Sequence, residues 1–441
     1  MRRGVAGLIA LACAAHSMGL SAQEFGSDPA AARCLSLDQA IELALTRSPE
    51  IQLANADRNR AEADLADARS VTRPQVSTFL RTQAGDNNLT GAGVENSVGV
   101  RVSQRLFDFG TSGLERRSAS LALEAREFDV MSARNETALE TALALIGYAE
   151  VESQIAITRE RETFFERERQ ATADALELGG ATLSELAEVS ARFADAAADR
   201  LELEFQRDRF GAALSRRVGA AGTPCLDALM AVAAADDPGI VESVERALGS
   251  NPRIQAADLQ REAQEVRAQR ARRNRLPAID LVGIASYAQD NFGNNDFGLR
   301  ERIGIDVSIP LFSGGRLRAD QQRANADRAA RESDVRRLRL DLAERVEVAV
   351  RRISSLTRQL ARRNEVVNRQ DEQFAAAQIE FNEGLRTLPE LVEDRLELEA
   401  ARLNEVSTRF ALLRETMELK ALSNSLIPAG IGQDRSLYGP Q

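Results

Sequence analysis

Apolar residues recur with the period of a helix along most of this chain. Within residues 317–383, the apolar positions alternate between steps of four and three: Leu342, Val346, Ala349, Ile353, Leu356 and Leu360. This spacing is the seam of a coiled coil. Residues 112–178 carry a corresponding uninterrupted helical pattern, and at 1.5 Å per residue each helix would be roughly 100 Å long. The pattern predicts long helices that pack side by side, and not a compact globule.

Four short segments alternate between apolar and polar residues, which is the period of a β-strand with one apolar face. Residues 96–107 and 301–312 show it best, with these apolar positions: Val98, Val100, Val102 and Leu106, then Ile303, Ile305, Val307, Ile309 and Leu311. Residues 75–84 and 278–287 alternate less cleanly. Each segment is about ten residues long, which is the length that a tilted membrane strand requires.

Motifs in the first half of the chain recur in the second half at a nearly constant distance. The sequence AIELALTRSPEIQ at residues 40–52 matches SVERALGSNPRIQ at residues 243–255, an offset of 203. Further along, GGATLSEL at residues 179–186 matches GLRTLPEL at residues 384–391, an offset of 205. The chain is therefore a duplicated unit, whose copies we call the first and second repeat.

Each repeat should contain a helix, two strands, a long helix, a turn and a return helix. The first helices should cover about 37–71 and 239–275, where Pro74 and Pro277 end them. The return helices are expected at 183–217 and 388–426. The segments that we expect along the chain are a signal peptide at 1–22, an N-terminal segment at 23–36, the first repeat at 37–217, an inter-repeat equatorial segment at 218–238, the second repeat at 239–426 and a C-terminal tail at 427–441.

A Leu-Phe-x-x-Gly sequence stands between the second strand and the long helix of each repeat. It reads IPLFSGGRL at residues 309–317 and RLFDFG at the matching place in the first repeat. Glycine allows the backbone to turn sharply where a strand gives way to a helix. Pro310 replaces Arg105, and Gly314 replaces Phe109, so we expect the two corners to bend differently.

The N-terminus has the pattern of an export signal. Arg2 and Arg3 precede the apolar run VAGLIALACAA, and small residues lead to a cleavage site after Ala22. Lipoprotein processing at Cys13 is the alternative, although Ala10 stands where that signal prefers Leu. Beyond this segment, no stretch approaches the ~20 apolar residues of a membrane helix. The sequence therefore predicts an exported protein.

Composition narrows the class of protein further. Charged residues make up 28% of the chain, aromatic residues only 4%, and Trp is absent, which favours long helices over a thick core. The lone His16 lies in the expected signal, which leaves no histidine for catalysis or for metal binding. No phosphate loop, nucleophile elbow or metal cluster is found, so we expect neither an enzyme nor a cofactor. The formal net charge of −10 gives little reason to bind nucleic acid.

Two cysteines remain after the expected signal. Cys34 precedes the first repeat, and Cys225 lies in the segment before the second. In an oxidising compartment such a pair is a candidate disulfide. Two separate buried thiols are the other reading that the sequence allows.

Four membrane strands cannot close a barrel alone, because barrels of this kind start at about eight strands. An open sheet edge in lipid would leave backbone groups without partners, so the membrane reading requires several chains. Two chains would give an eight-stranded barrel, which its own side chains fill. Three chains would give twelve strands, which leave room for a water-filled conduit.

These motifs resemble those of TolC-type outer-membrane factors. The resemblance rests on the duplicated Ser/Asn-Pro in the first helix, the Leu-Phe-x-x-Gly corner and the Thr-Leu-x-Glu-Leu tip, and it covers residues 37–426. It implies a mainly α-helical trimer in which four β-strands per chain form a shared twelve-stranded membrane β-barrel. Long antiparallel helical hairpins would form a periplasmic tunnel below it. The implied role is the exit duct of a tripartite efflux pump or a type I secretion system. The implied partners are a periplasmic adaptor, an inner-membrane RND or ABC transporter, and outer-membrane lipid.

The resemblance also assigns roles at the hairpin tips. Glu390 and Glu393 would form two acidic rings at the periplasmic mouth, where the family usually has Asp. Arg386 would tie neighbouring hairpins together, with Glu185 as its acidic partner. Phe381 stands where the family often has Tyr, so a hydroxyl hydrogen bond would be lost there. The alternative is that all five are ordinary solvated tip residues.

Two other classes of protein use long coiled coils. A periplasmic adaptor should have one hairpin that splits a β-rich domain, whereas this chain has two hairpins at matching positions. A filamentous structural protein would explain neither the export signal nor the paired strands. We therefore expect a channel that spans the outer membrane and extends into the periplasm.

Overall fold

The computed structural model describes residues 34–87, 91–219, 223–225, 239–290 and 296–428, and all structural statements refer to them. The expected signal peptide therefore lies outside the described residues, as do most of the inter-repeat segment and nearly all of the tail. No helix in the described ranges is both long enough and apolar enough to cross a membrane.

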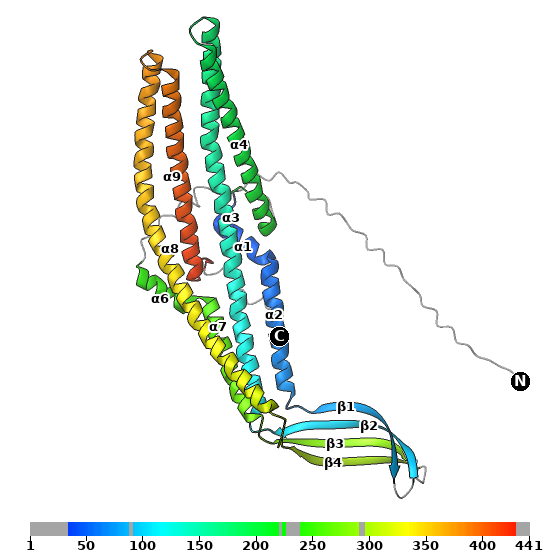
Figure 1. Ribbon diagram of the computed structural model, residues 1–441. Coiled ribbons are helices and arrows are strands. Elements are labelled where there is room, and N and C mark those ends of the chain that lie inside the picture. The colour runs from blue at the N-terminus through cyan, green and yellow to red at the C-terminus, as the bar shows by residue number, and fades with distance from the viewer. Residues whose placement is uncertain (1–33, 88–90, 220–222, 226–238, 291–295, 429–441) are drawn as a thin grey trace, which may run out of the picture. The chain divides into compact units, whose positions relative to one another are not determined.

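The structure contains the duplicated order of elements that the sequence predicts (Figure 1). The first repeat comprises α1 (Leu37–Arg47), α2 (Pro49–Ser70), β1 (Gln75–Asn87), β2 (Gly91–Phe107), α3 (Thr111–Glu177) and α4 (Leu183–Val218). The second repeat comprises α6 (Ile240–Ser250), α7 (Pro252–Arg273), β3 (Ala278–Asp290), β4 (Asp296–Ser308), α8 (Arg316–Asn382) and α9 (Leu388–Leu422). The return helix α9 thus ends four residues before the expected position.

The single first helix expected in each repeat is wrong, because the structure divides it in two. Proline disfavours the helical conformation in the residue before it. Ser48 and Asn251 accordingly have ψ angles of 123° and 120°. Each of them then caps the next helix, which begins with proline at its first position. The Ser-Pro and Asn-Pro pairs were the available signal for this break.

The four strands form one antiparallel sheet in the order β1-β2-β3-β4. Pairing of β2 with β3 joins the two repeats, while β1 and β4 are the edges. Strand β4 ends at Ser308 and not at the expected residue 312, because Pro310 has no N–H to donate to a ladder. At the loop end, all four strands extend further than the alternation indicated.

The sheet has two chemically different faces. Strand register and alternation place the exposed apolar side chains on one face: Val76, Leu80, Val98, Val100, Val102, Tyr287, Leu299, Ile303, Ile305 and Val307. The opposite face carries many of the charged side chains: Arg81, Arg101, Asp280, Arg300, Arg302 and Asp306. An apolar face that covers all four strands confirms the membrane-strand pattern read from the sequence.

The two corners have nearly the same φ angles at the turn itself but differ in the strand before it, because β2 continues to Phe107 whereas β4 ends at Ser308. Phe109 and Gly110 have φ angles of 53° and 84°, and Gly314 and Gly315 have 58° and 87°. Two successive residues with positive φ therefore turn the chain from strand into helix in each corner, and three of the four are glycines, which adopt this conformation readily. The corners also differ in packing, since Phe312 is 91% exposed and Phe107 is 52% exposed in the described chain.

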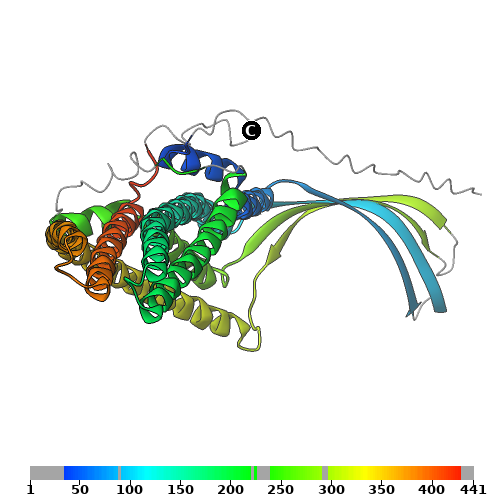
Figure 2. The ribbon, with the colours of Figure 1, turned by 90° about the horizontal axis from the view of Figure 1, so that it is seen from above.

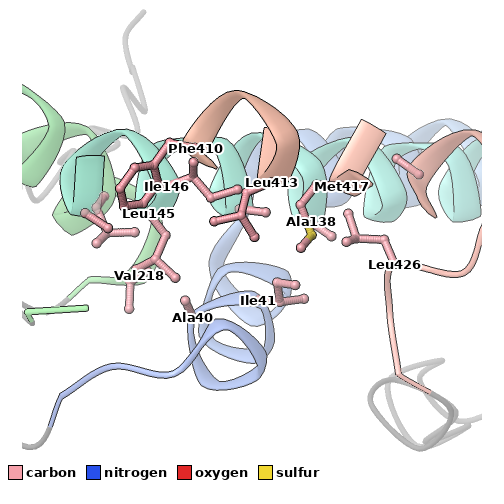
Figure 3. Packing of buried hydrophobic residues seen from close by; sticks show 14 of the residues in the cluster. Ala40, Ile41, Ala138, Leu145, Ile146, Val218, Phe410, Leu413, Met417 and Leu426 are labelled. Carbon is pink, nitrogen blue, oxygen red and sulfur yellow. The ribbon is translucent and has the colours of Figure 1, made fainter. Parts of the chain in front are cut away.

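The helices form two antiparallel hairpins, α3 with α4 and α8 with α9 (Figures 1 and 2). Helix α3 also contacts α7 and α9, so the two repeats pack along its length. Apolar side chains from α1, α3, α4 and α9 meet in the largest buried cluster, which Figure 3 shows from close by. The labelled members of this cluster are Ala40, Ile41, Ala138, Leu145, Ile146, Val218, Phe410, Leu413, Met417 and Leu426.

Candidate functional site at the hairpin tips

The same helix-capping motif is found at each hairpin tip. The Thr182 backbone N–H donates to Glu185 Oε2 at 2.7 Å, and the Glu185 N–H donates back to Thr182 Oγ1 at 3.2 Å. At the second tip, the Thr387 N–H and hydroxyl donate to Glu390 Oε2 at 2.8 and 2.7 Å. These capping boxes satisfy N–H groups that the first turn of a helix leaves without partners. The Thr-Leu-x-Glu sequence therefore starts the return helices α4 and α9.

Glu185 and Glu390 occupy equivalent positions in the two repeats. Hydrogen bonds from their threonines lower the pKa of both carboxyl groups, and Arg386 adds a smaller effect on the pKa of Glu390. Both side chains are therefore charged at neutral pH. Glu390 thus caps α9 in its own chain. The sequence pattern alone did not distinguish this structural role from the predicted acidic ring.

Glu393 follows three residues after Glu390 and is exposed to solvent. Residues three apart in a helix lie on the same side, so the two carboxylates share a side of α9. Phe381 is partly buried against an apolar cluster at the same end of the hairpins, together with Phe164, Phe374 and Leu391. The acidic rings need several chains, so their formation stays a prediction.

Arg386 forms its ion pairs within its own hairpin. One guanidinium nitrogen lies 2.7 Å from Asp394 Oδ2, and another lies 3.2 Å from Glu380 Oε2. Glu185 is not among the ion-pair partners recorded for Arg386 in the described chain. A tie between Arg386 and Glu185 of a neighbouring chain stays a prediction.

Sequence reasoning missed Asp394, which is a buried partner of Arg386. Only 4% of this residue is exposed, and its carboxylate also accepts a hydrogen bond from Gln373 at 2.7 Å. The signal lay in the duplication, because the equivalent residue in the first repeat is the fully buried Val189. A buried acid at an otherwise apolar position needs a charged partner, and here that partner is Arg386.

A second charged group, also missed, lies between the two hairpins away from the tips. We call it the inter-hairpin ion cluster, and it consists of Glu160, Arg161, Asp371, Arg395, Glu399 and Arg402. Comparing the repeats would have found it, because three of its α9 residues replace Ser190, Ala194 and Ala197 of α4.

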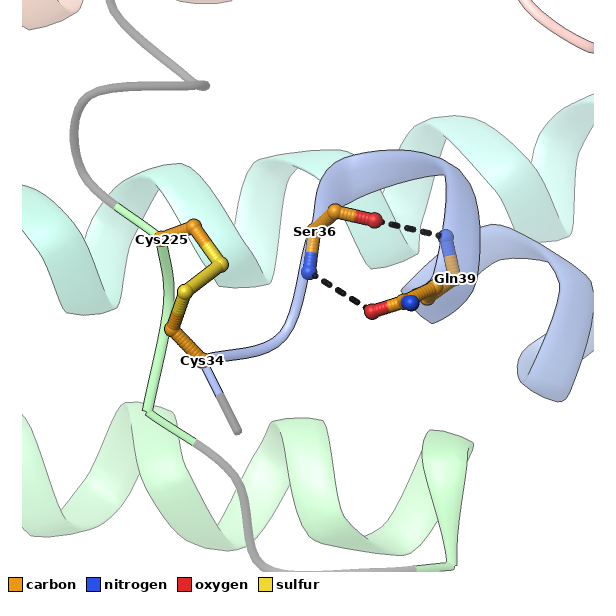
Figure 4. The surroundings of a disulfide bond; sticks show 4 residues. All are labelled: Cys34, Ser36, Gln39 and Cys225. Carbon is orange, nitrogen blue, oxygen red and sulfur yellow. Dashed lines mark hydrogen bonds between the residues drawn. A yellow bond between two sulfur atoms is a disulfide. The ribbon is translucent and has the colours of Figure 1, made fainter. Parts of the chain in front are cut away.

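A disulfide joins Cys34 to Cys225, which is one of the two readings that the sequence left open (Figure 4). Short backbone pairing surrounds it, since the Leu35 N–H donates to Thr223 O and the Cys225 N–H donates to Leu35 O. Ser36 then caps α1 with Gln39. The bond thus connects the start of the first repeat to the segment that precedes the second.

Metal binding has no visible basis at these sites. In the part of the chain that the structure describes, no group of three or more His, Cys, Asp and Glu side chains could hold an ion. The arrangement offers instead an exposed apolar sheet, acidic tips and long paired helices.

Solved structures of outer-membrane channels share this fold. The CmeC outer membrane channel of Campylobacter jejuni superposes with a TM-score of 0.77 at 14% identity, covering 91% of this chain and 88% of that one. The VceC outer membrane protein of Vibrio cholerae superposes with a TM-score of 0.73 at 18% identity, covering 89% and 96%. The chain therefore has the fold of these outer-membrane proteins.

The family model for outer membrane efflux proteins matches residues 40–220 and 243–425, one match for each repeat. The chain belongs to this family, which locates it in the outer membrane.

Curated relatives are more similar in sequence than these structures. The outer membrane efflux protein BepC of Brucella suis is 27% identical over 62% of this chain. The alkaline protease secretion protein AprF of Pseudomonas aeruginosa is 26% identical over 51% of it. The matches span 60% and 48% of the two relatives' own lengths. The pyoverdine export outer membrane protein OpmQ of the same species is 25% identical over 88% of this chain and 84% of its own length.

Proposed function

We propose that three copies of this chain form an outer-membrane channel that serves as the exit duct of an efflux pump or a type I secretion system. One observation carries the proposal: a four-stranded sheet with one exposed apolar face and two unpaired edges. Such a sheet is stable in lipid only when its edges meet other strands. Three copies supply twelve strands, enough for a barrel with a water-filled interior. The duct is a passive conduit with no catalytic step of its own.

The contacts between the two repeats provide a template for the contacts between chains. Within the chain, β2 pairs with β3, α3 packs on α7, and α3 packs on α9. The equivalent contacts of the second repeat would be β4 with β1, α8 with α2, and α8 with α4 of the next chain. Repeating one head-to-tail contact around an axis closes a ring.

Helix α4 has the surface that this assembly requires. Exposed apolar residues follow one another at steps of four and three: Ala187, Ala191, Ala194, Ala198, Leu201 and Phe205. This is a coiled-coil seam that no described part of its own chain covers. Helix α8 of a neighbouring chain is the partner that the template assigns to it.

We infer further that the hairpin tips form the gate. Glu390 and Glu393 would repeat around the axis as two carboxylate rings, which bind cations and select for them. Phe381 and Arg386 would hold the tips in place. Loss of Arg386 should loosen the tips, because the buried Asp394 would lose its cation.

Conductance across planar bilayers tests the proposal directly. Purified chains should form discrete channels, and divalent or trivalent cations added at the periplasmic side should block them. The double variant Glu390→Gln, Glu393→Gln should weaken this block. Glu188→Gln is the matched control, because Glu188 is the exposed equivalent of Glu393 at the other tip. Unaltered block in the double variant would refute the ring assignment.

The roles of the relatives in efflux, protease secretion and pyoverdine export support partners in the periplasm and the inner membrane. We propose a periplasmic adaptor and an RND or ABC transporter. In vivo cross-linking from the two tips, residues 179–186 and 384–391, should capture them. Recovery of neither class of partner would argue against the duct.

A further inference from the structure

A single buried arginine contacts both hairpins of the chain. Arg395 lies on α9, and only 7% of it is exposed. Its guanidinium carbon is 5.6 Å from the ring centre of Phe164 on α3 and 5.5 Å from that of Phe374 on α8. Cation–π contacts of this kind gain strength when the cation is desolvated. Arg395 therefore bridges three helices.

Ion pairs continue this connection along the seam between α3 and α9. Arg402 lies 2.6 Å from Glu160 on α3 and 2.7 Å from Asp371 on α8. Arg161 lies 3.3 Å from Glu399, a residue that is 2% exposed. The Arg402–Glu160 and Arg161–Glu399 pairs connect α9 of one hairpin to α3 of the other, while the Arg402–Asp371 pair links α9 to α8 within the second hairpin. Further toward the membrane end, Arg414 reaches Glu150 at 2.5 Å in the same way.

The seam proposed between chains has different chemistry at the same positions. There α4 carries Ser190, Ala194 and Ala197 where α9 carries Arg395, Glu399 and Arg402. On the other side, α8 carries Val366 where α3 carries Arg161. Most of the charges that bridge the hairpins of one chain therefore have no counterpart between chains.

We propose that the inter-hairpin ion cluster holds the two hairpins of one chain together as a unit, so that the periplasmic end opens at the seams between chains. The inference rests on the proposed trimeric channel. A small parting of the hairpins would leave the buried charges of the cluster without partners before water could solvate them, which is a costly arrangement. At the level of the cluster, parting the other seam separates mainly small or apolar side chains, Ser190, Ala194, Ala197 and Val366, which leave no buried charge without a partner. The seam between chains is thus the weaker one.

Matched cysteine pairs can test which seam moves. Gln154 on α3 and Leu403 on α9 border one cavity within the chain, and neither belongs to the cluster. Their equivalents, at the offset of 205, are Gln359 on α8 and Ala198 on α4, both exposed in the single chain. The first variant is Gln154→Cys, Leu403→Cys, and the second is Gln359→Cys, Ala198→Cys. A short bifunctional maleimide would bridge each pair in the assembled full-length protein, whose native disulfide stays intact.

Two readouts separate the inference from the proposed assembly. On denaturing gels, bridging 359 to 198 should give covalent dimers and trimers, while bridging 154 to 403 should leave monomers. In planar bilayers, the bridge between 359 and 198 should reduce the open fraction at least tenfold, and the bridge between 154 and 403 should leave it within about twofold of the unbridged protein.

A within-chain bridge that closes the channel would overturn the inference, and so would two bridges that both leave opening unchanged. In either case covalent trimers would still support the assembly. Absence of covalent oligomers would refute the proposed arrangement of chains and, with it, the inference.

Discussion

Helices α4 and α9 occupy the same place in the two repeats but have opposite surroundings. Phe410 of α9 is 1% exposed in the core beside α3, while its equivalent in α4, Phe205, is 63% exposed. Val406 and Leu201 differ in the same way. The apolar seam of α9 therefore recurs in α4, but α8, the equivalent of α3, leaves it exposed in the described chain. The uncovered copy marks where a neighbouring chain should pack.

Truncation of the two phenylalanines should separate these surroundings most strongly. Phe410→Ala should lower the free energy of unfolding by about 3–5 kcal/mol, because it leaves a cavity among Leu145, Ile146 and Leu413. Denaturant titration followed by circular dichroism would measure the loss.

Phe205→Ala provides the matched control for that experiment. Its side chain is exposed in the single chain, so unfolding of dissociated chains should change by less than about 0.5 kcal/mol. The fraction of assembled trimer, measured by light scattering in detergent, should fall instead. Equal destabilisation of single chains by both substitutions would contradict the difference between α4 and α9.

Removal of the disulfide tests whether the starts of the two repeats are held together by more than backbone pairing. The bond closes a loop between residues separated by 191 positions, and long loops restrict the unfolded chain most. Cys34→Ser should lower the free energy of unfolding by about 2–5 kcal/mol. Cys225→Ser should give the same loss, and the double variant should add nothing further. Additive losses would mean that the cysteines act separately, and mass mapping without reductant would identify the bond.

The extent of sequence prediction differs between the fold and the site for physical reasons. The hydrophobic period, the internal repeat and the length of the alternating segments were enough to predict the helices and strands. Burial of one face imposes this spacing of apolar residues along the whole element. Ser48 and Pro49 show where pattern failed, since helical periodicity continues across a break that backbone sterics require. Asp394 and Glu399 were missed because their partners come from distant segments. A contact between Arg161 and Glu399 spans 238 residues and leaves no local pattern.

The buried carboxyl group of Glu399 in α9 also predicts that stability depends on pH. Helix α4 should lack this effect, because Ala194 stands at the equivalent position. Burial raises the pKa of Glu399 above its ordinary value of 4.5, while Arg161 on α3 and Arg395 on α9 oppose the rise and Asp199 on α4 adds to it. A carboxyl group with a raised pKa in the folded state favours folding when protonated. This contribution is lost as the pH rises through the raised pKa.

Glu399→Gln should therefore gain thermal stability relative to the natural protein as the pH rises above 4.5, and the two should converge below it. Scanning calorimetry across this range would measure the difference. Glu397→Gln is the control, because Glu397 is an exposed residue on the same helix. A constant difference at all pH values would show that Glu399 does not titrate in this window.

The smallest expected effect concerns the two tips, which should behave alike. Hydrogen bonds from Thr182 and Thr387 lower the pKa of Glu185 and Glu390. For a lowered pKa, the stabilisation is present above the ordinary value of 4.5 and is lost as the pH falls through the folded value. Acid should therefore loosen the first turns of α4 and α9, seen as faster amide hydrogen exchange after correction for the intrinsic rate.

Thr182→Ala and Thr387→Ala should each produce this loosening at neutral pH in their own tip and leave the other unchanged. Arg386 should make the acid response of the two tips differ. It lowers the pKa of Glu390 and has no counterpart at the first tip, where Ala181 stands. Arg386→Gln should move the acid loosening of α9 toward higher pH while α4 keeps its own midpoint. A shift at both tips would mean that Arg386 reaches Glu185 as well, as a tie between neighbouring chains requires.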